Sequence, residues 1–199
     1  LSAGFMLGRP ELLNLSWLLL GLAFLVFIAA SLTSLARATA KNATKTALLL
    51  SILSLAGAVT LGMLLARGYA NGLPLPYARL AAAHISLALG GWVLLLAVGV
   101  SYQVVPMFQL TPNYPKWMTA RLAPAIFASL LLNLALLVPE SVPQWARFIA
   151  ESIFWSLAGC FAVATLRLQN QRRRRVPDAA LSFFRLGMLS LLLAALFSL

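Results

Sequence analysis

Apolar residues occur in long runs that are nearly free of charge, and polar residues are gathered in the short segments between them. Six of these runs are long enough to cross a hydrocarbon core, which takes about 20 residues of helix. They lie near residues 12–35, 46–66, 80–105, 120–138, 145–166 and 181–199. The pattern predicts an all-α fold, a polytopic bundle of six transmembrane helices that forms a single domain over residues 1–199.

The connections between the runs are short and contain helix-breaking residues. Residues 71–76 separate spans two and three, residues 106–115 separate three and four, and residues 139–143 separate four and five. Connections of this length make consecutive helices antiparallel neighbours in one bundle. Because proline lacks a backbone N–H, we expect Pro106 to end or kink the third span.

Charged residues are distributed unevenly between the two sets of connections. The odd-numbered connections hold most of the basic residues, namely Arg37, Lys41, Lys45, Lys116, Arg121, Arg167 and Arg172 to Arg175. The other side has Arg9, Arg67, Arg79 and Arg147, partly offset by Glu11, Glu140 and Glu151. By the positive-inside rule, the odd-numbered connections are cytoplasmic and both ends lie outside. This places the chain in the cell (inner) membrane of a bacterium as a multi-pass protein.

Composition supports the membrane assignment. Hydrophobic residues make up 62% of the chain and charged residues 10%, which lies far from the average of soluble domains. The net charge of +11 is explained by membrane orientation, so the lipid bilayer is the expected partner and nucleic acid is not. The Arg172 to Arg175 run is interpreted as a topology anchor, with an anionic-lipid patch as the alternative.

The ends of the sequence suggest a piece of a longer protein. The chain opens on Leu1 rather than methionine and closes on an apolar run at Leu199. We therefore expect a partner in the remaining half of the same protein or in another membrane subunit.

The single histidine, His84, lies in the third span, about one turn below its expected outer end. An ionisable residue inside a membrane is costly, and its default interpretation is a functional site. The residues around it are small: Ala81, Ala82, Ala83, Ser86, Ala88, Gly90 and Gly91. They permit either close helix packing, with Ala58, Gly62 and Ala66 of the second span as the partner, or space for a planar cofactor.

Three further residues are candidates for cofactor binding. Met63 lies at nearly the same depth as His84, and a His/Met pair is a known axial set for haem, although methionine also serves as packing filler. Tyr102 and Gln103 near the other end of the third span could bind a quinone or a haem propionate. Their alternative role is that of interfacial belt residues.

Other polar residues in the spans have structural explanations. Glu151 can be neutralised by Arg147 four residues earlier, with a proton relay as the alternative. Arg185 can extend to the inner surface, and the lone Cys160 is a packing residue. Phosphate-binding glycine loops, Cys-x-x-Cys and His-x-x-x-His pairs and Ser/His/Asp sets are absent from the sequence, so hydrolytic or nucleotide-driven chemistry is not expected.

The segment from His84 to Trp92, followed by Gly99-Val-Ser-Tyr-Gln-Val-Val-Pro-Met-Phe108, resembles a signature found in relatives of haem–copper oxidase subunit I. The resemblance covers about an eighth of the chain. It implies a twelve-span bundle with metal ligands on several helices, of which six spans could be half, and oxidoreductase-like chemistry. His84 matches the first histidine of the signature, a haem or copper ligand. Ser86 stands at the second histidine position and cannot replace it, so copper is not expected in this chain.

Two functions follow from these observations. The first is a haem-binding redox membrane protein in which His84 is an axial ligand near the outer face, although the chain contains no complete catalytic motif. The second is a metal-free membrane module for transport, sensing or assembly, in which His84 is hydrogen-bonded within the bundle.

Overall fold

The computed structural model describes residues 2–39, 42–137, 139, 141–173 and 179–198. The structure is 88% helix, and the residues in these ranges form no strand. Six helices are long and apolar enough to cross a membrane. The predicted all-α, six-span fold is therefore confirmed, and the chain is an integral membrane protein built as a helical bundle.

Each predicted span corresponds to one long helical segment. The chain begins with a short α1 (Ser2–Leu7), followed by α2 (Pro10–Arg37), α3 (Ala43–Asn71), and a third span made of α4 (Tyr77–Ile85), the π-helix η1 (Ser86–Val93) and α5 (Leu94–Gln109). The remaining helices are α6 (Lys116–Leu137), α7 (Gln144–Asn170) and α8 (Ala179–Ser198). Predicted residues 138 and 199 lie outside the described ranges.

The third span is longer than its sequence prediction. It begins at Tyr77 instead of residue 80, which places His84 about two helical turns below the first residue of α4. At the other end it continues past Pro106 to Gln109, so of the two alternatives, an end or a kink, the end at this proline was wrong. A proline so close to the end removes one hydrogen bond from the last turns, and the helix closes there on Leu110 in the left-handed conformation (φ 53°).

Local sequence signals set both ends of α3. The Asn42 side chain accepts a hydrogen bond from the Lys45 backbone N–H at 2.9 Å, which caps the first turn. Gly72 ends the helix in the left-handed conformation with φ 63°, which glycine adopts without a Cβ penalty. These two signals fix the length of the helix against which the third span packs.

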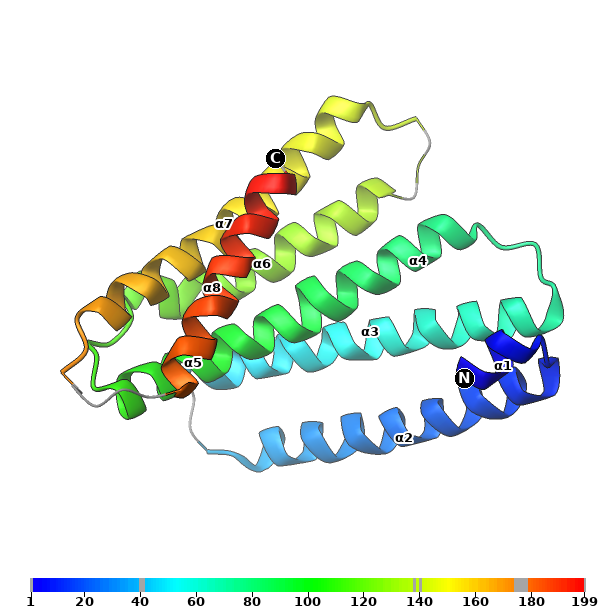
Figure 1. The fold of residues 1–199 in the computed structure, drawn as a ribbon, viewed down its shortest axis with the longest axis horizontal. Helices are drawn as coiled ribbons and strands as arrows, with labels where there is room; N and C mark the ends of the chain where they lie inside the picture. The colour runs from blue at the N-terminus through cyan, green and yellow to red at the C-terminus, as the bar shows by residue number, and fades with distance from the viewer. Residues whose placement is uncertain (1, 40–41, 138, 140, 174–178, 199) are drawn as a thin grey trace.

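Helix α3 lies at the centre of one half of the bundle (Figure 1). It packs against α2, against all three parts of the third span and against α6, while α7 packs between α6 and α8. Helix α2 forms one edge of the bundle and is mostly exposed, with Leu13 and Gly21 as its buried residues. The best-buried core, around Leu95, Ile126 and Phe161, therefore lies away from α2.

Small residues bring α3 and the third span into close contact. A Cβ added to Gly91 would lie 2.6 Å from Ser54 Oγ, and one added to Gly99 would lie 3.0 Å from the Ala47 Cβ. Backbones approach this closely only where side chains are absent. Spans two and three therefore pack through small residues, which is one of the two uses that the sequence left open for them.

Candidate functional site

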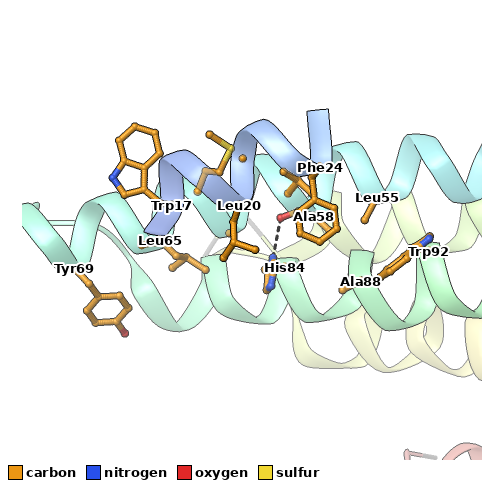
Figure 2. Close-up of a pocket in the computed structure, with 15 residues that line it drawn as sticks. Trp17, Leu20, Phe24, Leu55, Ala58, Leu65, Tyr69, His84, Ala88 and Trp92 are labelled. Carbon is orange, nitrogen blue, oxygen red and sulfur yellow. Dashed lines mark hydrogen bonds between the residues drawn. The ribbon is translucent and has the colours of Figure 1, made fainter. Parts of the chain in front are cut away.

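A cavity of about 450 Å³ lies between α2, α3 and the first half of the third span (Figure 2). Its lining is mainly apolar and includes four large aromatic side chains, namely Trp17, Phe24, Tyr69 and Trp92. His84 and Met63 also line it, and His84 is the one titratable nitrogen group among the lining residues. Both residues, which the sequence places at nearly the same depth, therefore line one cavity.

The His84 ring is held by a hydrogen bond between helices. Its Nδ1 lies 2.8 Å from the backbone carbonyl oxygen of Ala58 on α3 (Figure 2). A carbonyl oxygen only accepts, so Nδ1 is the donor and carries the proton. In the neutral ring, Nε2 then keeps its lone pair, and no described residue forms a hydrogen bond with it. The bond selects one tautomer and leaves one basic nitrogen at the cavity.

Gly62 provides the space for this ring. A Cβ at Gly62 would lie 2.9 Å from His84 Cε1 and 3.3 Å from Nδ1, so any larger residue would push the imidazole away from α3. Ala58 and Gly62 are one helical turn apart, and the ring therefore lies across a strip of small residues. The Ala58, Gly62, Ala66 ladder accepts both the third span and the histidine.

One wall of the cavity follows the third span across the junction of α4 and the π-helix. His84, Ala88 and Trp92 all line the cavity at a spacing of four residues. Residues at this spacing share one face of a helix, and two of the three, Ala88 and Trp92, belong to η1, which begins at Ser86. Such π segments in α-helices are frequent at functional sites. Ser86 itself is not among the lining residues.

Met63 packs on α2. A Cβ added to Gly21 would lie 2.7 Å from the Met63 sulfur and 2.5 Å from its terminal methyl, so the thioether lies against the bare backbone of Gly21. The His84 ring is bonded to α3. Both side chains line one cavity, but each is in contact with a different helix.

Tyr102 and Gln103 are not brought to a common site. The Tyr102 hydroxyl donates a hydrogen bond to the Met118 backbone carbonyl at 3.0 Å, and its ring packs edge-on against Tyr114 with centroids 5.2 Å apart. Gln103 is exposed on the surface of α5. Neither residue lines the cavity at His84.

Tyr114 and Thr165 form a buried polar contact that the sequence did not indicate. Tyr114 lies in the connection between α5 and α6, and its hydroxyl is 2.9 Å from Thr165 Oγ1 on α7. Thr165 donates to the Phe161 carbonyl, so Tyr114 is the donor in this pair. Burial raises the pKa of Tyr114 to about 12, although hydrogen bonds with Thr165 and Ser101 act in the opposite direction. A lone tyrosine in a short connection gives no sequence signal for this contact.

Gln169 is one turn beyond Thr165 on α7 and fully buried. Neither its amide nitrogen nor its amide oxygen has a hydrogen-bond partner in the described part of the chain. Sequence reasoning did not single out this residue, because a glutamine near a helix end is usually exposed.

The other polar residues that the sequence singled out form hydrogen bonds, pack against the core, are exposed or lie outside the described residues. Arg147 donates to the Pro139 carbonyl at 2.8 Å, and the described residues form no ion pair between Arg147 and the exposed Glu151. Arg185 donates to Asn170 Oδ1 at 3.0 Å, at the end of α7. Cys160 is a free thiol packed against the core. Lys41, Glu140, Arg174 and Arg175 lie outside the described residues.

The described residues contain no group of three or more His, Cys, Asp and Glu side chains that could hold a metal ion. No family model, curated protein or solved structure matches this chain.

Proposed function

We propose that this chain is a membrane-embedded haem-binding protein with a redox role, in which the cavity between α2, α3 and α4–η1 holds the cofactor. His84 Nε2 would be the axial ligand. The observation that supports this proposal most strongly is the hydrogen bond from Nδ1 to the Ala58 carbonyl at the cavity wall. Haem would supply one-electron chemistry that no side chain of this site provides.

His84 makes the same kind of hydrogen bond that metal-binding imidazoles make through their other ring nitrogen. Such a histidine almost always donates its other ring N–H to a carboxylate, a backbone carbonyl or water, which fixes the tautomer and the ring orientation. Here the Ala58 carbonyl is the acceptor at 2.8 Å, and Gly62 allows the ring to lie against α3. The fold thus orients the His84 ring before a ligand binds.

The cavity suits a planar apolar group. Its volume of about 450 Å³ lies in the usual range of ligand pockets, which are mostly lined by apolar and aromatic side chains with a few polar groups. Trp17, Phe24 and Trp92 provide flat surfaces for a macrocycle. Met63 is the candidate second ligand, and its unbranched thioether can turn from Gly21 toward the cavity.

The resemblance to relatives of haem–copper oxidase subunit I points to the same histidine. His84 matches the first histidine of that signature, and Ser86 at the second position does not line the cavity. The proposal is therefore limited to haem, with no copper centre in this chain.

Absorption spectroscopy tests the proposal. The untagged full chain, purified from membranes of cells supplied with haem, should show a Soret band that is lost in His84→Ala. Met107→Ala is the matched control, because Met107 lies on the exposed surface of α5, outside the cavity. A Soret band of equal intensity in His84→Ala, or no Soret band in the unsubstituted chain, would contradict haem binding at this site.

The same hydrogen bond also supports a second function. If His84 only links α4 to α3, the chain is a metal-free membrane module for transport, sensing or assembly. His84→Asn can still donate a hydrogen bond from its side-chain amide but provides no imidazole. If the unsubstituted chain shows no Soret band and His84→Asn is as stable as wild type, the second function is favoured. If a Soret band is present in the wild type and lost in a stable His84→Asn protein, haem is favoured.

A further inference from the structure

We propose that a second site, in the groove between the first turns of α3 and α6, binds an anionic phospholipid. The groove has a volume of about 560 Å³ and is separate from the His84 cavity, with which it shares no lining residue. It lies at the end of the bundle where α3 and α6 both begin. This proposal does not depend on haem binding.

The groove wall changes from polar to apolar along the helix axis. Asn42, Lys45 and Thr46 line it at the start of α3, and Thr119 lines it from α6. Leu49 and Leu50 line it about one turn deeper into α3, toward the middle of the span. A phospholipid has the same order, with its headgroup at the surface and its acyl chains deeper.

The polar end offers hydrogen-bond donors to a group that only accepts. The Lys45 ammonium donates to the Ala38 carbonyl at 2.6 Å, which holds it at the groove and leaves two of its three N–H donors. Asn42 Oδ1 accepts from the Lys45 backbone, so the Asn42 side-chain NH₂ remains as a further donor. A lipid phosphate is an acceptor that this arrangement of donors can bind.

Charge favours an anionic lipid over a zwitterionic one. Lys116 and Arg121 lie on the first turns of α6 beside Thr119 and Ala120, and Arg37 ends the preceding helix. The described acidic residues, Glu11 and Glu151, lie toward the opposite end of the bundle. Clusters of basic residues at a membrane surface attract anionic lipids. We therefore assign the occupant as an anionic phospholipid.

The test measures lipid binding to the purified full chain in detergent. Dioleoylphosphatidylglycerol is titrated and followed by native mass spectrometry, with dioleoylphosphatidylcholine as the zwitterionic comparison. We expect phosphatidylglycerol to bind more tightly than phosphatidylcholine, and Lys45→Gln to weaken its binding about fivefold. Arg9→Gln is the matched control, because it removes one exposed cation at the opposite end of the bundle.

A second variant tests the groove itself. Ala120 is exposed and lines the groove, so Ala120→Phe should fill it and lower phosphatidylglycerol binding while the chain stays folded by gel filtration. Glycerol 3-phosphate, which has the headgroup chemistry without acyl chains, should bind far more weakly. Equal binding of both lipids, equally tight binding of glycerol 3-phosphate, or unchanged binding in both Lys45→Gln and Ala120→Phe would overturn the proposal.

Discussion

At the scale of single residues, the candidate site depends on a glycine as much as on the histidine. The His84 ring reaches the Ala58 carbonyl because Gly62 presents no side chain at this point of α3. The histidine could be found from the sequence, since an ionisable residue in a membrane span is rare. The role of Gly62 could be proposed only as one step of a packing ladder, because its contact with the imidazole depends on how two helices pair.

Gly62→Ala should displace the His84 ring. The new Cβ would lie 2.9 Å from Cε1, closer than real Cβ contacts, so the ring must move away from Ala58. Overpacking of this kind costs about 1–3 kcal/mol. We expect a lower unfolding temperature in detergent and a weaker Soret band.

The matched control is Gly187→Ala in α8, where a Cβ would meet nothing within 4 Å. Alanine has the higher helix propensity, so this substitution should leave stability unchanged or raise it slightly. If Gly62→Ala changes the unfolding temperature and the Soret band no more than Gly187→Ala does, Gly62 does not provide the space for the His84 ring.

At the scale of elements, the number and approximate positions of the spans could be predicted and the form of the third span could not. Apolar runs reveal helices because every backbone polar group in lipid must be bonded within its own segment. The π-helix Ser86–Val93 leaves no such signal, since it contains the same apolar and small residues as its α-helical flanks. That His84, Ala88 and Trp92 line a cavity together with α2 and α3 appeared only in the structure.

The packing of η1 on α3 predicts a strong effect for Gly91→Ala. The added Cβ would lie 2.5 Å from the Ser54 Cβ. Ser54 is buried, and its Cβ is bonded directly to the backbone, so it cannot rotate out of the way. We expect a loss of unfolding free energy that Ser54→Gly in the double variant partly restores, measured as a double-mutant cycle.

Gly159→Ala on α7 serves as the comparison, because its Cβ would make only an ordinary contact at 3.8 Å with Leu192. A Gly91→Ala protein as stable as Gly159→Ala, or a double variant with no restored stability, would contradict the close packing of η1 against α3.

At the scale of the whole molecule, the bundle of antiparallel neighbours was predictable because short connections leave few alternatives. The cavity was not, because α2, α3 and the third span contribute to it and no pattern in one segment specifies its neighbours. The positions of both ends outside the membrane remain a prediction from loop charge.

Labelling tests this orientation. In a Cys160→Ala background, Leu73→Cys should react with a membrane-impermeant maleimide in intact cells, because it lies in the connection between α3 and α4. Asn113→Cys, between α5 and α6, should react only after the membrane is opened. The reverse pattern would invert the topology.

The central claim, that His84 Nε2 is the ligand of a haem in this cavity, has one direct test. His84 is the only histidine in the chain, so growth with ¹⁵N-histidine labels one imidazole of an untagged protein. Electron–nuclear double resonance on the oxidised, haem-loaded protein should then show ¹⁵N coupling to the iron, in addition to the porphyrin ¹⁴N signals. A haem signal without any ¹⁵N coupling would contradict the assignment of His84 as ligand.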